Sequence, residues 1–177
     1  LAVAQALQQR SRTVVWLGSY RGLESRIVPV NNIDMEQISV SGLRGKGGLT
    51  LLLALLNLIW AFAQSLCVMI RYRPAAVLGM GGFVSGPGGI AAWLMRRPLL
   101  IHEQNAVLGR VNRNMARNAS VIASGFDRLD RLPAGKPHKA VGNPVRAPIL
   151  AVRNQPYPST DDKLTLLVTG GSQGSQI

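Results

Sequence analysis

The residues that could do chemistry in this chain begin with a glycine-rich loop, Gly79–Gly89. It holds Gly79, Gly81 and Gly82, follows a short apolar run and opens onto Pro87, a favourable early residue of a helix. A strand, a glycine loop and a helix N-terminus in this order let backbone N–H groups approach an anion or a polar sugar. A tight strand-to-helix turn without a ligand is the alternative reading of the same residues.

A second loop of this kind, Gly170–Gly174, follows the apolar run Leu164–Thr169. Two such loops favour a ligand cleft between two half-domains. Neither loop has the dinucleotide fingerprint, because Val84 replaces the third glycine of the first loop and Ser172 the second glycine of the second. A nicotinamide-dependent dehydrogenase is therefore poorly supported.

A polar cluster, His102-Glu103-Gln104-Asn105, directly follows another apolar run. A carboxylate, carboxamides and an imidazole at a strand end can bind hydroxyls or transfer protons. Alternatively, Glu103 caps the next helix or pairs with an arginine. Arg146, after a Gly-Asn-Pro turn, could hold a phosphate or pair with a carboxylate.

Alternating strands and helices must position these residues. Apolar runs predict strands at Thr13–Leu17, Met35–Ser39, Ala75–Leu78, Leu99–His102 and Ser120–Ala123. Helices are expected at Leu1–Gln9, Leu23–Val28 (ending at Pro29), Leu49–Ile70, Pro87–Met95 and Leu108–Ala116, with a loop from Asp127 to Lys139. This order predicts an α/β fold, a Rossmann-like parallel sheet with helices on both faces and ligands at the carboxyl ends of the strands.

The segment Leu49–Ile70 contains 22 residues without a charge, between Arg44 and Lys46 on one side and Arg71 and Arg73 on the other. Small or polar residues recur three and four apart along it and form one narrow stripe: Thr50, Ala54, Asn57, Ala61, Gln64 and Val68. Such a stripe favours close packing of the helix on the chain's own domain. The bulky apolar residues would then face surroundings outside that domain. Three readings stay open, namely a buried core helix, a membrane-spanning helix, and a helix lying in a membrane interface.

Composition restricts the function classes. The chain has 177 residues, is 47% hydrophobic and carries a net charge of +12 that is spread along its length. This charge suits phosphorylated substrates or an anionic membrane, whereas no nucleic-acid-binding module is recognisable. Cys67 is expected to be a buried thiol in a reducing compartment, and neither His102 nor His138 has neighbours at metal-ligand spacing. The first twenty residues contain no signal peptide.

Five motifs in order carry a resemblance to a known family: Ser41–Gly47, Gly79–Gly89, His102–Asn105, Val141–Arg146 and Gly170–Gly174. They closely resemble the bacterial peptidoglycan N-acetylglucosaminyltransferases of the MurG family over essentially the whole chain. The resemblance implies a two-domain GT-B fold and transfer of N-acetylglucosamine from UDP-GlcNAc to lipid I, undecaprenyl-pyrophosphoryl-MurNAc-pentapeptide, forming lipid II. It also implies inversion at the anomeric carbon without a covalent enzyme intermediate, and no metal or other cofactor.

The resemblance also implies site residues. The donor-binding residues would be Asn105, Arg146, Gly171, Ser172 and Gln173, and Glu103 is a tentative catalytic residue. The acceptor-binding residues would be Gly79, Gly81, Gly82, Phe83, Ser85 and Gln104. The family's proposed general base, a histidine in an earlier glycine loop, has no counterpart in this sequence.

An apolar membrane patch is implied as well, formed by Leu52, Leu56, Ile59, Phe62 and Trp93. The protein is thus expected to be peripheral, at the cytoplasmic face of the bacterial inner membrane, near other cell-wall synthesis and division proteins. The expected domains are an acceptor- and membrane-binding domain at 1–152, a linker at 153–163, and the start of a truncated UDP-sugar-binding domain at 164–177. The chain is read as a fragment that lacks catalysis by itself.

Two other functions remain open on the sequence. One is another GT-B enzyme with a lipid acceptor, or a UDP-sugar epimerase of the same fold. The other is a basic, non-enzymatic protein of the membrane surface whose glycine loops are only turns.

Overall fold

The computed structural model describes residues 1–40 and 48–156. The chain divides into two compact units, Leu1–Val145 and Arg146–Ile177. The first unit thus ends earlier than the boundary at residue 152 that the sequence suggests. Most of the expected linker and the whole segment 164–177 lie outside the described residues, so that part of the domain assignment stays a prediction.

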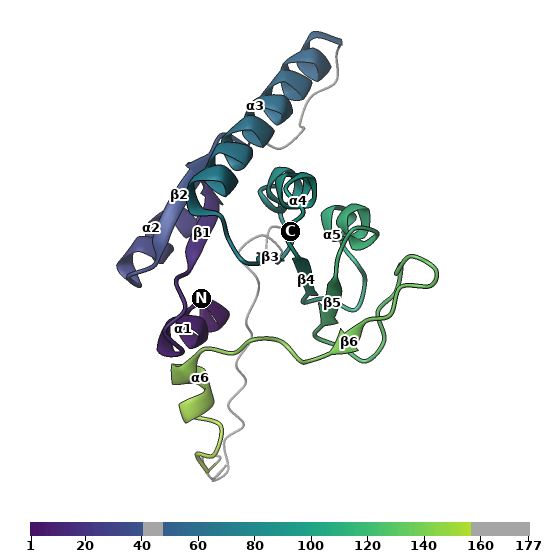
Figure 1. Ribbon diagram of the computed structural model, residues 1–177. Coiled ribbons are helices and arrows are strands. Elements are labelled where there is room, and N and C mark those ends of the chain that lie inside the picture. Colours follow the sequence, from purple (N-terminus) through teal and green to yellow (C-terminus); the bar gives the residue numbers. More distant parts are fainter. Residues whose placement is uncertain (41–47, 157–177) are drawn as a thin grey trace, which may run out of the picture. The chain divides into compact units, whose positions relative to one another are not determined.

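The first unit alternates strands and helices as the sequence predicts (Figure 1). The strands are β1 (Val15–Ser19), β2 (Asp34–Ile38), β3 (Val77–Gly79), β4 (Leu99–Glu103), β5 (Val121–Ser124) and β6 (Lys139–Ala140). Its helices are α1 (Ala2–Gln9), α2 (Glu24–Val30), α3 (Gly48–Tyr72), α4 (Ser85–Leu94) and α5 (Arg110–Ala116), and the second unit contains α6 (Ala147–Ala151). The short strand β6 falls at the end of the stretch expected to be loop.

Most element ends differ from the sequence prediction by one or two residues, and two of these differences involve proline. Helix α2 runs through Pro29 to Val30 rather than ending before it, so the hydrogen bond that proline cannot donate is lost only in the last turn of the helix. Helix α4 begins at Ser85, so Pro87 is its third residue rather than its first. A proline in the first turn is tolerated because the N–H groups there have no partner inside the helix.

Among the described residues all the strand pairings are parallel, but they form two sheets rather than the single sheet expected. One contains β1 and β2, and the other has the order β3-β4-β5-β6. The register in the larger sheet pairs Gly79 with Ile101 and Glu103 with Ser124. The carboxyl ends of β3, β4 and β5 therefore lie at one edge, which is where the polar residues were expected to gather.

One face of the larger sheet is covered by helices and forms a core. Leu99, Ile101 and Ile122 alternate onto this face and pack with Leu108 and Ala116 of the α5 region. Helices α4 and α5 lie beside each other along it (Figure 1). Leu78, Leu100 and Val121 point to the opposite face and line an open cavity there, so helices cover the two faces unequally.

Helix α3 packs through its small and polar stripe, as the spacing predicts. Ala61 is 1% exposed and Ser65 is fully buried, and Gln64 accepts a hydrogen bond from the Ser39 backbone at the end of β2. The bulky residues of its first half remain exposed, so the buried-core reading of this helix is wrong. Cys67 is likewise exposed rather than buried.

Candidate active site

The glycine loop after β3 makes a tight turn into α4. Gly79 is the buried last residue of β3, and Gly81 and Gly82 have φ angles of +84° and +79°, which residues with a side chain rarely adopt. The Ser85 hydroxyl donates to the Gly81 carbonyl over 2.5 Å and closes the turn. Phe83 at its tip is 64% exposed. The loop therefore presents backbone and one exposed aromatic ring beside the N-terminus of α4.

Glu103 ends β4 as a buried carboxylate with every oxygen engaged. Oε1 accepts from the Asn105 backbone N–H (3.2 Å) and Asn105 Nδ2 (3.0 Å). Oε2 accepts from the Gly109 N–H (3.0 Å) and Asn112 Nδ2 (2.9 Å). Burial by itself raises the pKa of the Glu103 carboxyl, but the hydrogen bonds from Gly109, Asn112 and Asn105 outweigh it and hold the pKa below its usual value. Glu103 is thus an ionised organiser of the loop that follows it.

Asn105 lies exposed above this carboxylate. Its Nδ2 is fixed by Glu103, and because a carboxamide is planar, the direction of its side-chain oxygen is fixed as well. The arrangement supplies an oriented polar group at the carboxyl edge of the sheet. Such a group suits recognition of a hydroxyl or an amide.

Asn112 of α5 is a site residue that the sequence reasoning missed. It is 2% exposed, and its Nδ2 donates to Glu103 Oε2 and also to the His102 carbonyl (3.3 Å). A Cβ on Gly81 would lie 3.5 Å from the same nitrogen. Asn112 therefore bonds to the polar cluster and lies close to the glycine loop. The only sequence signal for it was a polar residue on the otherwise inward side of a short helix.

Gln104 and His102 turn toward the chain segment that follows β6. Gln104 Nε2 contacts His102 Nδ1 (3.1 Å), and His102 Nε2 contacts the Gly142 carbonyl (3.0 Å). The Gln104 carbonyl accepts from Asn143 Nδ2 (3.1 Å). The structure thus places Gln104 in contact with the turn before Arg146.

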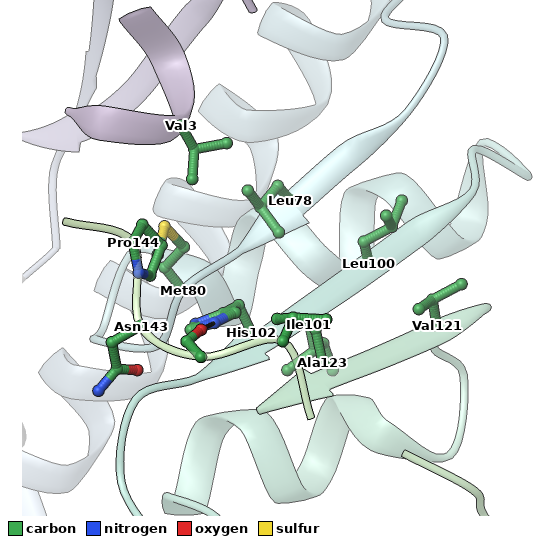
Figure 2. Close-up of a pocket in the computed structure, with 12 residues that line it drawn as sticks. Val3, Leu78, Met80, Leu100, Ile101, His102, Val121, Ala123, Asn143 and Pro144 are labelled. Atoms are coloured by element: carbon green, nitrogen blue, oxygen red, sulfur yellow. Dashed lines mark hydrogen bonds between the residues drawn. The ribbon is translucent and has the colours of Figure 1, made fainter. Parts of the chain in front are cut away.

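A cavity of about 360 Å³ opens on the uncovered face of the larger sheet (Figure 2). Figure 2 shows Leu78, Leu100 and Val121 on its floor and Val3 of α1 above them. His102 and Asn143 border it at the end where the strands finish. The lining is mainly apolar. Its polar side chains, His102 and Asn143, lie at the same edge of the sheet as Glu103 and Gly79.

The other residues expected to bind the donor belong to the second unit or lie outside the described part of the chain. Arg146 is exposed and occupies the N-cap position of α6. Gly171, Ser172 and Gln173 lie outside the described residues, so their assignment stays a prediction.

Four of the five residues of the expected membrane patch are exposed: Leu52, Leu56, Ile59 and Trp93, each at 54–55%. Phe62 is partly buried instead and packs against Met69 and Ala91, because the second half of α3 lies alongside α4. The sequence reasoning did not include the other large apolar side chains that are exposed in the described part of α3, which are Leu51, Leu53, Leu55, Leu58, Trp60 and Ile70. This helix is also long and apolar enough to cross a membrane.

Comparison with known proteins identifies the relatives of this chain. Residues 1–124 match the glycosyltransferase family 28 N-terminal domain. The chain is 45% identical over 181 aligned residues to the UDP-N-acetylglucosamine–N-acetylmuramyl-(pentapeptide) pyrophosphoryl-undecaprenol N-acetylglucosamine transferase of Marinobacter nauticus, with 100% of this chain and 49% of the relative covered. It is 49% identical to the protein of the same name from Alkalilimnicola ehrlichii, with 99% of this chain and 49% of that protein covered.

Solved structures agree in fold. The crystal structure of Acinetobacter baumannii MurG matches with a TM-score of 0.68 and 37% identity, over 80% of this chain and 40% of that one. A putative UDP-N-acetylglucosamine 2-epimerase from Listeria monocytogenes matches with a TM-score of 0.54 at 16% identity, over 72% of this chain and 35% of that one, and shares the fold alone.

The chain spans about half the length of the curated relatives it matches. The match to their family model covers most of the first compact unit, including β1 to β5 and the polar cluster at their ends. The chain therefore belongs to glycosyltransferase family 28, of which residues 1–124 form the N-terminal domain.

Proposed function

We propose that this chain supplies the acceptor-binding and membrane-binding half of an inverting N-acetylglucosaminyltransferase. The donor is UDP-GlcNAc, the acceptor is lipid I, and the product is lipid II. The observation that carries the proposal is the shared edge of β3 and β4, where the glycine loop at Gly81 lies close to Asn112, which donates to Glu103 of the polar cluster. The names of the close relatives supply the substrates.

The acceptor face is the glycine loop. Gly81 and Gly82 expose backbone rather than side chains, and the loop ends at the N-terminus of α4, where unpaired N–H groups favour an anion. A pyrophosphate linked to a lipid is such an anion. Gly79, Phe83, Ser85 and Gln104 complete the proposed acceptor surface.

In the proposed reaction the muramyl hydroxyl of the acceptor attacks the anomeric carbon of GlcNAc. A carbon–oxygen bond forms as the bond to the UDP oxygen breaks, and the hydroxyl proton passes to a base. Glu103 suits proton transfer poorly, because its oxygens already accept four hydrogen bonds and its pKa is lowered. Its proposed role is to orient Asn105 toward the donor sugar.

Negative charge develops on the departing UDP. We propose that Arg146 and the backbone N–H groups of Gly171, Ser172 and Gln173 stabilise it without a metal ion, since the sequence has no Asp-x-Asp motif. A guanidinium gives a diphosphate two parallel hydrogen bonds, which a lysine cannot.

Helix α3 is the proposed membrane anchor. Its exposed leucines, Ile59 and Trp60 cover roughly 220° of the circumference at 100° per residue, while the small stripe faces the protein. Each half-exposed side chain would gain about 1 kcal/mol on entering a membrane. Arg71 lies in the last turn of the helix, Arg73 directly follows it, and basic residues also precede it in the sequence. These cations suit an anionic surface. The helix also packs against α4 and β2 of its own unit, which favours a helix lying along the membrane surface over one that spans the membrane. We propose the cytoplasmic face of the inner membrane as the location of the protein.

The test is product analysis with the full-length protein. It is incubated with UDP-GlcNAc labelled in the sugar and with lipid I in anionic vesicles, and the products are separated by chromatography. Transfer of the label to lipid II is expected, and Arg146→Ala should reduce it while leaving the melting temperature of the protein unchanged.

The same experiment separates the competing functions. Label converted to another UDP-sugar without entering lipid would indicate an epimerase, and label entering a different lipid would indicate another acceptor. Binding to vesicles without any turnover would indicate a surface protein, and each of these outcomes would overturn the proposal.

A further inference from the structure

The side chain of His102 joins β4 to the turn at which the first unit ends. It is 5% exposed, and its Nε2 lies 3.0 Å from the Gly142 carbonyl. A carbonyl can only accept, so Nε2 carries the proton. Gln104 Nε2 also donates to the His102 carbonyl (3.3 Å), which turns the amide nitrogen toward the ring and makes Nδ1 an acceptor. Both partners therefore require the neutral imidazole with its proton on Nε2.

A second connection acts on the next residue of the same turn. Asn143 Nδ2 donates to the Gln104 carbonyl over 3.1 Å. Gly125 leaves room for this side chain, because a Cβ there would come within 2.2 Å of Asn143 Oδ1. The Val141 N–H donates to Ser124 (2.9 Å), and Gly142 has a φ of +75°. Three successive residues of the turn are thus fixed to the ends of β4 and β5.

These contacts hold the chain directly before the boundary between the two units. Val145 is the last residue of the first unit and Arg146 the first of the second. We infer that His102 is a positioning residue: with Gln104 it fixes the turn Val141–Val145, and so the point from which the donor-binding unit and Arg146 begin. The effect on catalysis rests on the proposed transferase function, whereas the fixed turn does not.

The test compares substitutions at His102 in the full-length protein. His102→Leu fills the space but cannot donate, and His102→Gln can place an amide nitrogen near the position of Nε2. His138→Leu is the matched control, because His138 also contacts a backbone carbonyl (Asp127, 3.0 Å) but is only partly buried and bonds within another loop. Hydrogen exchange of the peptide covering residues 141–145 reports the turn directly. Steady-state kinetics measure how a loosened turn changes the KM for the donor, UDP-GlcNAc.

Loss of one neutral hydrogen bond should speed exchange in this peptide about two- to tenfold in His102→Leu. The KM for UDP-GlcNAc should rise by a similar factor, while the KM for lipid I stays near the wild-type value. His102→Gln should restore both quantities, and His138→Leu should change neither. In the wild type, nitrogen NMR should find the His102 proton on Nε2.

Unchanged hydrogen exchange at residues 141–145 in His102→Leu would overturn the inference that His102 fixes this turn. Faster exchange with an unchanged donor KM would overturn the positioning role. If His102→Leu does not fold, Asn143→Ala, which removes only the second connection, is measured against the same two outcomes. If the wild-type protein transfers no GlcNAc, the proposed function fails, and the exchange and NMR results still decide whether the turn is fixed.

Discussion

The substitution Glu103→Gln tests whether an ionised carboxylate holds the active-site loop together. The side chain keeps its shape, but one oxygen that accepts two hydrogen bonds becomes an amide nitrogen facing two donors. A hydrogen bond to a charged group contributes about 1.5–3 kcal/mol. Glu103→Gln loses two such hydrogen bonds. A neutral amide costs less free energy to bury than a carboxylate, and this offsets part of the loss. The expected net cost is about 2–4 kcal/mol in the free energy of unfolding.

Thermal unfolding of the full-length protein, followed by circular dichroism, measures this cost. For a unit of this size each kcal/mol corresponds to about 2–4 °C, so the transition should fall by roughly 5–15 °C at neutral pH. Glu36→Gln is the matched control. Glu36 makes a partly exposed ion pair with Arg71 (3.2 Å) and accepts a hydrogen bond from the Tyr72 hydroxyl (2.6 Å), and Glu36→Gln should cost about 1 kcal/mol, because glutamine can still accept the Tyr72 bond.

The pH dependence gives a second, independent check. The folded pKa of Glu103 lies below its unfolded value, so as the pH falls the unfolded chain takes up this proton first. The stabilisation is therefore complete above the ordinary glutamate pKa of about 4.3 and is lost as the pH falls through the folded pKa. The difference in the free energy of unfolding between wild type and Glu103→Gln should therefore decrease as the pH is lowered. Equal stability at neutral pH, or a gap that stays constant in acid, would refute the role assigned to the carboxylate.

Three further predictions follow from the same structure. Asn105→Ala should lower kcat/KM for UDP-GlcNAc about ten- to a hundredfold, with a smaller fall in melting temperature than Glu103→Gln, because it removes only one of the four hydrogen bonds to Glu103 and water can replace the donor at this exposed position; near-normal kinetics would remove Asn105 from the donor site. Gly81→Ala should destabilise the glycine loop by about 1–3 kcal/mol through its positive φ and raise the KM for lipid I, and a wild-type acceptor KM would argue against this loop as the acceptor face. The triple variant Leu52→Ser/Leu56→Ser/Ile59→Ser should stay folded, because all three side chains are exposed, yet sediment less with anionic vesicles; undiminished sedimentation would show that α3 is not the anchor.

Much of the fold followed from local patterns in the sequence. Apolar runs of strand length and the alternation of strands with helices predicted the parallel α/β architecture, because these signals depend only on neighbouring residues. The stripe of small or polar residues on α3 likewise predicted which side of that helix packs on the protein, and buried Ala61 together with partly buried Ala54, Asn57, Gln64 and Val68 confirms it. The glycine loop and the polar cluster were found because chemistry at strand ends requires unusual residue types in short segments.

Tertiary structure decided what those residues do to one another. The sequence marks Glu103 as a possible acid or base, but only the approach of Asn112 and Gly109 from α5 and the loop before it fills its oxygens and lowers its pKa. Phe62 has the same spacing as its exposed neighbours and is covered only because α4 lies beside that half of α3. The contact between His102 and Gly142 joins residues forty positions apart. Contacts of this kind arise when parallel strands bring their ends to one edge, and no local pattern in the sequence encodes them.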